Sequence, residues 1–167
     1  MKLTVIGCSG SMSGKDSPAS SYLLQAIGPD ADNERVWSII IDFGPGAMGH
    51  LLRYADPARI DGMFLSHLHA DHCADIVGMQ VYRRWYPEGA LGRIPVFSPG
   101  DGAARTRGIA DDPVEETYAG SSNFTRSSRQ TPSGSVLSIS SSLLDTIRFP
   151  LWRCVSRVHR NRIRPSV

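Results

Sequence analysis

The sequence predicts an α/β layered domain over residues 1–120 and an irregular Ser/Arg-rich tail over residues 121–167. Two features predict the domain: short apolar strands arranged as hairpins come first, and strand-then-helix patterns follow, as in layered α/β folds. A third feature predicts the tail, because residues 121–167 hold twelve serines against nine in the preceding 120 residues. A length of 167 residues fits about one domain.

The first part of the domain is predicted to be rich in strands. β-branched and apolar runs predict strands at residues 2–8, 19–26 and 36–44. Small and turn-forming residues predict a loop at 9–18, and the polar stretch at 28–35 predicts a turn. The three strands are therefore expected to form hairpins.

Strand and helix patterns alternate over the second part. Apolar residues at helical spacing predict helices at 47–55 and 74–85, and apolar runs predict strands at 60–66 and 93–99. A turn and a helix are expected at 100–110. The expected buried face of the helix at 74–85 consists of Ile76, Val77, Met79 and Val81. In such a domain, loops at the ends of strands carry the chemistry.

The formal charge is divided unevenly: residues 1–120 carry a net −5 and residues 121–167 a net +7. A basic tail is typical of a nucleic-acid or membrane contact. A nucleic-acid-binding module is therefore one alternative function, although the tail lacks interleaved aromatic residues. Three scattered cysteines argue against a disulfide framework, and no apolar stretch is long enough to span a membrane. We expect a cytoplasmic protein without membrane contact.

Residues 66–75, SHLHADHCAD, concentrate metal-binding side chains where an expected strand meets an expected helix. His67, His69, Asp71 and His72 offer three imidazoles and one carboxylate, which are ligands that zinc, manganese and iron accept. The turn lets these side chains converge on two metal ions. Two such ions can lower the pKa of a water and stabilise the attacking and leaving oxygens of a displacement.

The segment HLHADH has the HxHxDH form of the metallo-β-lactamase superfamily, and the sequence resembles that family over residues 1 to about 119. The segments VIGCSGSMSGKDSPASSYLLQ and IIIDFGPGAMG resemble its ribonuclease Z-like branch, which includes bacterial cyclic-nucleotide phosphodiesterases. The resemblance implies a dinuclear metal hydrolase with an αββα sandwich fold. Residues 1–120 would form the N-terminal half of that sandwich.

The resemblance also implies a role for each residue of the motif. His67 and His69 would bind the first metal ion, and Asp71 and His72 the second. Asp71 would also act as the general acid or base that protonates the leaving oxygen. Asp42 would orient a ligand imidazole without touching the metal, and a purely structural role as a turn cap is the alternative for this residue. Two divalent ions are expected, zinc first, with manganese and iron as alternatives.

Other polar residues near the motif are given structural roles. The loop at 9–18 is expected to form the lip of the active site, because it departs from the phosphate-loop pattern at Ser9 and Asp16. Cys73 is expected to be a small packed side chain. Arg83 and Arg84 could meet a substrate phosphate, but a solvated helix face is the preferred interpretation.

The family pattern stops before its metal site is complete. The resemblance implies a further histidine, a metal-bridging aspartate and a final histidine, whereas His159 is the sole histidine after residue 72 and matches no family motif. Because the composition changes abruptly at residue 121, we hypothesise that the chain is truncated, with residues from about 121 read in a shifted frame. The alternative is a disordered tail. The polypeptide itself is then expected to be weakly active or inactive.

The resemblance implies a metal-dependent hydrolase, with a cyclic nucleotide or an RNA end as the expected substrate. The alternatives are a hydrolase of another ester, a thioester or a lactam, and a non-catalytic nucleic-acid-binding remnant. The oligomeric state stays open, with a homodimer among the alternatives because members of the family often dimerise.

Overall fold

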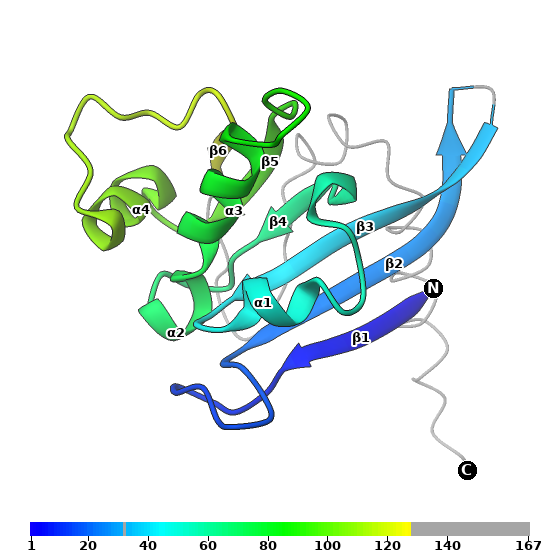
Figure 1. The fold of residues 1–167 in the computed structure, drawn as a ribbon, viewed down its shortest axis with the longest axis horizontal. Coiled ribbons are helices and arrows are strands. Elements are labelled where there is room, and N and C mark those ends of the chain that lie inside the picture. The colour runs from blue at the N-terminus through cyan, green and yellow to red at the C-terminus, as the bar shows by residue number, and fades with distance from the viewer. Residues whose placement is uncertain (32, 128–167) are drawn as a thin grey trace, which may run out of the picture.

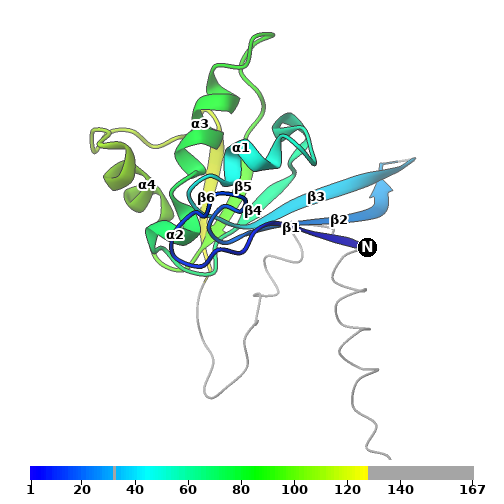
Figure 2. The same cartoon turned by 60° about the horizontal axis from the view of Figure 1, so that its bottom comes forward.

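The computed structural model describes residues 1–31 and 33–127, which build one six-stranded sheet with helices packed against it (Figures 1 and 2). The strands are β1 Lys2–Gly7, β2 Ser21–Asp30, β3 Asn33–Phe43, β4 Gly62–Phe64, β5 Ile94–Ser98 and β6 Ser122–Arg126. The helices are α1 Ala47–Leu51, the 3-10 turn η1 Pro57–Arg59, α2 Ala70–Cys73, α3 Ile76–Arg84 and α4 Gly102–Ala110. The predicted α/β class is confirmed.

The order of strands across the sheet follows their order in the chain, β1-β2-β3-β4-β5-β6. β1, β2 and β3 pair antiparallel, whereas β3, β4, β5 and β6 pair parallel. Hairpins can join antiparallel neighbours, but parallel neighbours need a crossover. The sequence pattern of hairpin strands followed by strand-helix units therefore matches the observed topology.

The hairpin of β2 and β3 is longer than the sequence predicts. The prediction of a turn at 28–35 is wrong over most of that stretch. Pro29 pairs with Glu34, so the chain reverses only at the residues around Ala31. Side-chain contacts stabilise the end of the hairpin. Trp37 Nε1 on β3 donates to the Pro29 carbonyl on β2, and the Arg35 guanidinium lies 3.4 Å from the centre of the Trp37 ring. These contacts stabilise a polar ribbon that periodicity alone does not detect.

The main hydrophobic core lies between the sheet and the helices. Leu23, Ile40, Met63 and Val96 point from neighbouring strands toward the same side and are almost fully buried. The helices contribute Leu51, Ile76 and Met79 to the same cluster. Burial of each such side chain stabilises the fold by about 1.5–3 kcal/mol relative to exposure.

The buried face of α3 differs from the prediction. Ile76 and Met79 are buried as expected, but Val81 is 54% exposed. Arg83 is 4% exposed instead of solvated, because its guanidinium donates to the backbone carbonyls of Gly92 and Pro57. The prediction of a solvated arginine is therefore wrong for Arg83, since hydrogen bonds satisfy its buried charge.

The sheet continues beyond residue 120, where the sequence places the end of the domain. β6 pairs in parallel with β5, and Phe124 lies on the same side of the sheet as the buried Val96. The run SNFTR contains one apolar residue, so it shows no alternation of apolar and polar residues that would predict a strand. Pairing with β5 is what makes it a strand. The rest of the predicted tail, including His159 and most of the segment assigned to a shifted frame, lies outside the described residues.

The described part of the chain contains no helix with the length and apolarity needed to cross a membrane.

Candidate metal centre

The HxHxDH motif lies at the carboxyl end of β4, on the short connection to α2 and on α2 itself. Asp42 lies near the carboxyl end of β3, which is the parallel neighbour of β4. Parallel strands bring their carboxyl ends to one edge of the sheet, where binding sites of α/β folds commonly form. The topology therefore places Asp42 beside the motif, although 24 residues separate it from Ser66.

The structure brings the four predicted ligands together. One ligand atom from each of His67, His69 and Asp71 lies within 4.8 Å of those of the other two. The centre of the His72 ring lies 3.9 Å from that of the His67 ring, with the two planes tilted by 47°, and His72 Nε2 lies 3.3 Å from Asp71 Oδ2. His69 is exposed, whereas His67, Asp71 and His72 are half-buried, so the cluster opens to solvent on one side.

Asp42 connects the backbone of the motif to two of its imidazoles. Its carboxylate accepts hydrogen bonds from the Ser66 amide at 2.7 Å, the Ser66 hydroxyl at 2.8 Å and His72 Nδ1 at 2.8 Å. The contacts expected for both roles of Asp42 are therefore present, because it accepts the amide of the turn and the imidazole of His72, a candidate ligand. Its φ of 54° lies in the left-handed region, which aspartate tolerates better than most residues.

The hydrogen bonds of Asp42 select one tautomer for two histidines. Since an ionised carboxylate can only accept, His72 must carry a proton on Nδ1, which leaves Nε2 unprotonated in the neutral ring. The Ser66 hydroxyl donates its single proton to Asp42, so its oxygen accepts from His67 Nδ1 at 3.0 Å. The Nε2 atoms of both rings are thereby free to bind a metal, which is the arrangement that outer hydrogen bonds impose in many metal sites.

The surroundings of Asp71 favour its ionised form. Burial raises the pKa of this carboxyl, but a hydrogen bond from its own backbone, one from the Ser11 hydroxyl and electrostatic interactions with the neighbouring His72 and His67 lower it by more. The net pKa therefore lies below the ordinary value for aspartate, and the ionised carboxylate is the form that binds a cation. Ser11 lies on the loop between β1 and β2, where the sequence places the lip of the site.

Gly44 allows α2 to approach the sheet closely. A Cβ atom at this position would lie 1.9 Å from the Asp71 carbonyl oxygen and 2.8 Å from the Ala19 side chain. Both distances are far below van der Waals contact, so only glycine fits without a shift of the backbone. The run IDFG therefore contributes twice to the site. Asp42 accepts hydrogen bonds, and the missing side chain of Gly44 leaves room for the Asp71 carbonyl.

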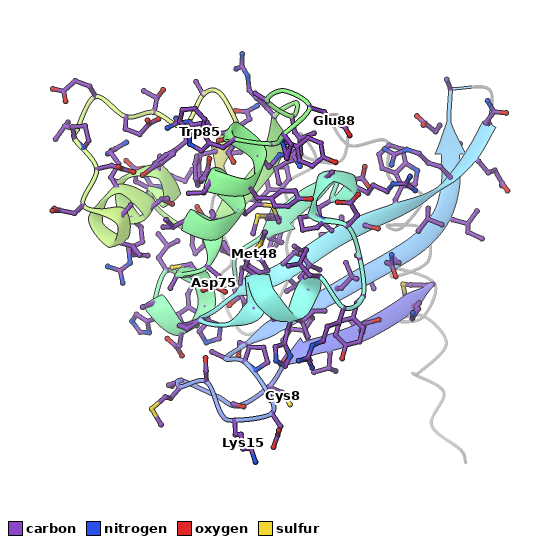
Figure 3. The ribbon with its side chains drawn as sticks, viewed as in Figure 1. Cys8, Lys15, Met48, Asp75, Trp85 and Glu88 are labelled. Carbon is purple, nitrogen blue, oxygen red and sulfur yellow. The ribbon has the colours of Figure 1, made fainter. Side chains whose placement is uncertain are left out.

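Asp75 is a functional neighbour that reasoning from the sequence missed. Its carboxylate accepts the Met48 amide of α1 at 2.7 Å (Figure 3), which connects the first turn of α1 to the residue directly before α3. Burial raises the pKa of Asp75, while hydrogen bonds from the Met48, Gly46 and Ala47 amides oppose this effect. An aspartate directly before a helical pattern suggests a cap for that same helix, whereas this one caps a different helix.

Cys73 is packed as expected. It is 1% exposed, and its Sγ donates to the His69 carbonyl at 3.1 Å. Its position inside the motif is therefore structural, and burial raises the pKa of its thiol.

The donor set fits a divalent transition metal. Imidazole nitrogen and carboxylate oxygen are ligands of zinc and also suit iron and manganese, so the donors alone do not select among these metals. Within residues 1–31 and 33–127, the group formed by His67, His69 and Asp71 is the one whose donor atoms converge closely enough for an ion.

Comparisons with known proteins identify a family for this chain. A family model described as the metallo-beta-lactamase superfamily matches residues 15–119. The uncharacterized protein Rv1339 of Mycobacterium tuberculosis is 45% identical over 113 residues, which is 68% of this chain and 38% of that protein. The probable metallo-hydrolase YhfI of Bacillus subtilis is 36% identical over 80 residues, or 48% of this chain and 30% of that protein.

Solved structures share the fold at low sequence identity. The metallo-beta-lactamase fold protein YhfI of Bacillus subtilis matches with a TM-score of 0.61 and 24% identity, over 80% of this chain and 49% of that one. The long form of RNase Z from yeast matches with a TM-score of 0.57 and 19% identity, over 73% and 17% of the two chains. The short form of human tRNase Z matches with a TM-score of 0.54 and 18% identity, over 75% and 44%. The chain thus spans well under two thirds of the length of these proteins.

Proposed function

Because the chain belongs to the metallo-beta-lactamase superfamily, we propose that it carries the metal-binding motif of a metal-dependent hydrolase that cleaves phosphodiesters. One observation supports this most strongly: Asp42 and Ser66 hold the Nδ1 atoms of His72 and His67, and the Nε2 of His72 lies 3.3 Å from Asp71 Oδ2. A chance cluster of surface histidines would not have its tautomers selected in this way.

His67 and His69 would hold one divalent cation, and Asp71 with His72 a second. When bound, such a pair supplies Lewis acidity, which lowers the pKa of a water and stabilises the charge on the attacking and leaving oxygens. Asp71 would first accept a proton on its carboxylate and then transfer it to the leaving oxygen, since its lowered pKa keeps it ionised at the start. Ser11, which contacts Asp71, lies on the loop that the sequence predicts to form the lip of the site.

The phosphodiester part of the proposal rests on the resemblance of residues 5–25 and 39–49 to the ribonuclease Z-like branch. A cyclic nucleotide or an RNA end is the proposed substrate, and zinc the first metal, with manganese and iron as alternatives. The similarity to YhfI, a probable metallo-hydrolase, supports the hydrolase part. The proposal also includes a cytoplasmic location, with a homodimer as the candidate assembly. Weak activity is expected of the 167-residue chain.

Metal content and substrate hydrolysis test the proposal. The full chain is loaded with zinc or manganese, its metal content is measured by elemental analysis, and it is assayed with bis-p-nitrophenyl phosphate, a cyclic nucleotide and a lactam. We expect bound metal in the wild-type chain, a loss of at least about tenfold in affinity in His67→Gln, and weak hydrolysis of a phosphodiester alone. His50→Gln is the matched control, because His50 lies on α1 outside the motif.

Each alternative gives a different result. Hydrolysis of the lactam instead of the phosphodiesters would assign the chain to another substrate class. Equal metal content in wild type and His67→Gln would contradict the metal site itself.

A further inference from the structure

Arg105 connects α4 to the metal-binding motif. Its Nε donates a hydrogen bond of 2.9 Å to the carbonyl of Leu68, which is the residue between His67 and His69. The two residues are 37 positions apart in the sequence. The contact therefore exists only because β5 and α4 return the chain to the end of β4.

Cys73 holds the next carbonyl of the motif. Its sulfur donates to the carbonyl of His69 at 3.1 Å, and the charge of Arg105 acts on the same thiol. Two consecutive carbonyls, those of Leu68 and His69, are thus each held by one side chain. The His69 carbonyl also accepts the His72 amide at 3.0 Å, which starts α2.

Hydrogen bonds also fix the first turn of α4, which carries Arg105. Asp101 caps α4 by accepting the Ala104 amide at 2.9 Å, and the Thr106 hydroxyl donates to the Gly102 carbonyl. Just before this helix, a Cβ built on Gly100 would lie 3.6 Å from Leu68 Cδ1, at ordinary van der Waals distance. The turn that leads into α4 therefore lies close to Leu68, and Arg105 adds a hydrogen bond to the same residue.

We infer that Arg105 is a positioning residue of the metal centre. It holds the backbone between His67 and His69 so that their imidazoles lie edge-to-face, with ring centres 4.9 Å apart, before a metal binds. Asp42 and Ser66 orient the rings of His67 and His72 through their Nδ1 atoms, whereas Arg105 acts on the backbone that carries His69. This inference rests on the proposed function, because it assigns Arg105 to the same metal-binding motif.

Arg107 provides a matched comparison on the same helix. It is also half-buried, and its Nη1 also donates to a backbone carbonyl, that of Glu116, at 2.9 Å. Glu116 lies on the loop between α4 and β6, not on the motif. Loss of Arg107 removes the same kind of bond from α4 and leaves the motif contacts in place.

The experiment compares Arg105→Gln, Arg105→Lys and Arg107→Gln with the wild-type full chain. Cobalt affinity and the cobalt absorption spectrum are measured by titration, and hydrogen exchange of residues 66–74 is measured without metal. We expect Arg105→Gln to bind cobalt about 10- to 100-fold more weakly, with an altered spectrum and faster exchange of the His72 amide. Arg105→Lys should recover part of the affinity, because its ammonium can still donate to Leu68. Arg107→Gln should resemble the wild type.

Two results would overturn the inference. One is unchanged exchange of residues 66–74 in Arg105→Gln, and the other is an equal loss of cobalt affinity in Arg107→Gln, which would indicate a general effect on α4. If the wild-type chain binds no cobalt, the proposed function fails. Hydrogen exchange in the metal-free chain then still decides whether Arg105 orders the motif, so the two failures are distinguishable.

Discussion

Asp42 acts at the scale of single residues by selecting the tautomer of two imidazoles. Its carboxylate can only accept hydrogen bonds, so the protons of His72 and, through Ser66, of His67 lie on Nδ1. An asparagine has the same shape but can donate from its amide. The proton on His72 could then move to Nε2, where it blocks a metal.

We predict that Asp42→Asn binds zinc about 10- to 100-fold more weakly than the wild type, with little change in fold. Zinc affinity is measured by competition with a chromophoric chelator, and the fold is checked by circular dichroism. Asp61→Asn is the matched control, because Asp61 also accepts a backbone amide, that of Ser38 at 2.7 Å, away from the motif. Equal affinity of Asp42→Asn and the wild type would exclude the tautomer argument.

Part of the site is visible in the sequence because it is local. His67, His69, Asp71 and His72 fall within six residues, and a strand-to-helix turn is sufficient to bring such residues together. The role of Ser66 as a hydrogen-bond bridge carries no comparable signal, because serine is common before turns. Only the position of Asp42 on the neighbouring strand explains why the Ser66 hydroxyl matters.

Gly44 acts at the scale of elements, since it sets the distance between β3 and α2. A Cβ there would lie 1.9 Å from the Asp71 carbonyl oxygen, so a larger residue must displace α2 or the strand end. A displaced α2 would move Asp71 and His72 away from His67. The stability of the fold and the geometry of the site therefore depend on the same gap.

We predict that Gly44→Ala lowers the free energy of unfolding by about 1–3 kcal/mol, as expected for overpacking, and weakens zinc binding. Unfolding in urea and zinc titration measure the two effects. Gly49→Ala is the control: Gly49 lies in α1, and nothing lies within 4 Å of a Cβ at this position. It should be neutral or more stable by about 0.4–1 kcal/mol. A Gly44→Ala protein as stable as Gly49→Ala would contradict the close approach.

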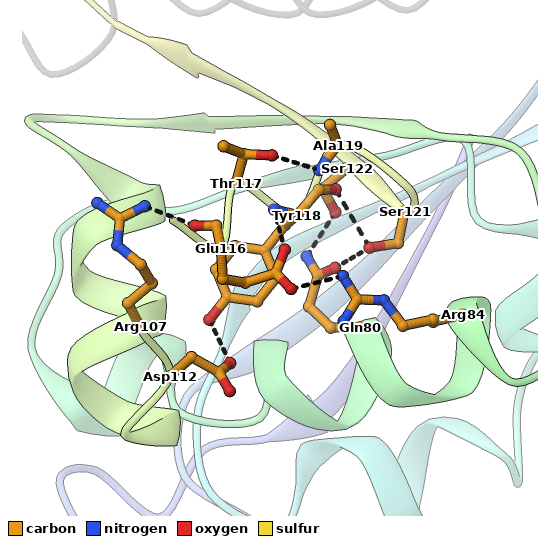
Figure 4. A network of polar contacts seen from close by, with 10 residues as sticks. All are labelled: Gln80, Arg84, Arg107, Asp112, Glu116, Thr117, Tyr118, Ala119, Ser121 and Ser122. Carbon is orange, nitrogen blue, oxygen red and sulfur yellow. Dashed lines mark hydrogen bonds and ion pairs between the residues drawn. The ribbon is translucent and has the colours of Figure 1, made fainter. Parts of the chain in front are cut away.

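The elements predicted from periodicity exist, but their buried faces were only partly predictable. Val81 fits the apolar stripe of α3 and is nevertheless exposed. Gln80 takes a buried position instead, because its side-chain amide bonds the hydroxyls of Ser121 and Ser122 beside β6 (Figure 4). A polar side chain with partners can replace an apolar one in the interior. Those partners lie more than 40 residues away, beyond the reach of a local pattern.

At the scale of the whole molecule, the loop between α4 and β6 connects both helices of that side to the sheet (Figure 4). Glu116 is its centre: its carboxylate pairs with Arg84 at 2.8 Å and accepts the Tyr118 amide, while its carbonyl accepts from Arg107. The side-chain hydrogen bond from Arg84, followed by that from the Tyr118 amide, holds the pKa of Glu116 below its ordinary value. Its contribution to stability is therefore pH-dependent.

The lowered pKa of Glu116 fixes the direction in which stability changes with pH. The unfolded chain binds a proton on Glu116 near pH 4.3, about the ordinary value, whereas the folded protein binds it only at lower pH. The ionised carboxylate therefore stabilises the fold fully above the unfolded pKa, and this contribution is lost as the pH falls through the folded pKa.

We predict that Glu116→Gln is less stable than the wild type at pH 7 and that the difference shrinks as the pH falls below about 4. The free energy of unfolding in urea is measured for both proteins from pH 7 to pH 3. Glu88→Gln removes the same charge at an exposed position on the loop after α3 and should show a smaller, flatter difference. A constant difference between wild type and Glu116→Gln across this range would reject the role of the ionised carboxylate.

The sequence by itself determined the α/β class, the approximate place of most strands and helices, and the four candidate ligands of HLHADH. These features depend on local periodicity, on turn chemistry and on residues six positions apart at most. The tertiary structure alone decided that β6 completes the described sheet, that Asp42 and Ser66 set the tautomers of His72 and His67, and that Arg105 holds the backbone between two ligands. The physical reason is the parallel pairing of β3, β4 and β5, since crossovers return distant residues to one sheet edge. No pattern within a single segment carries that information.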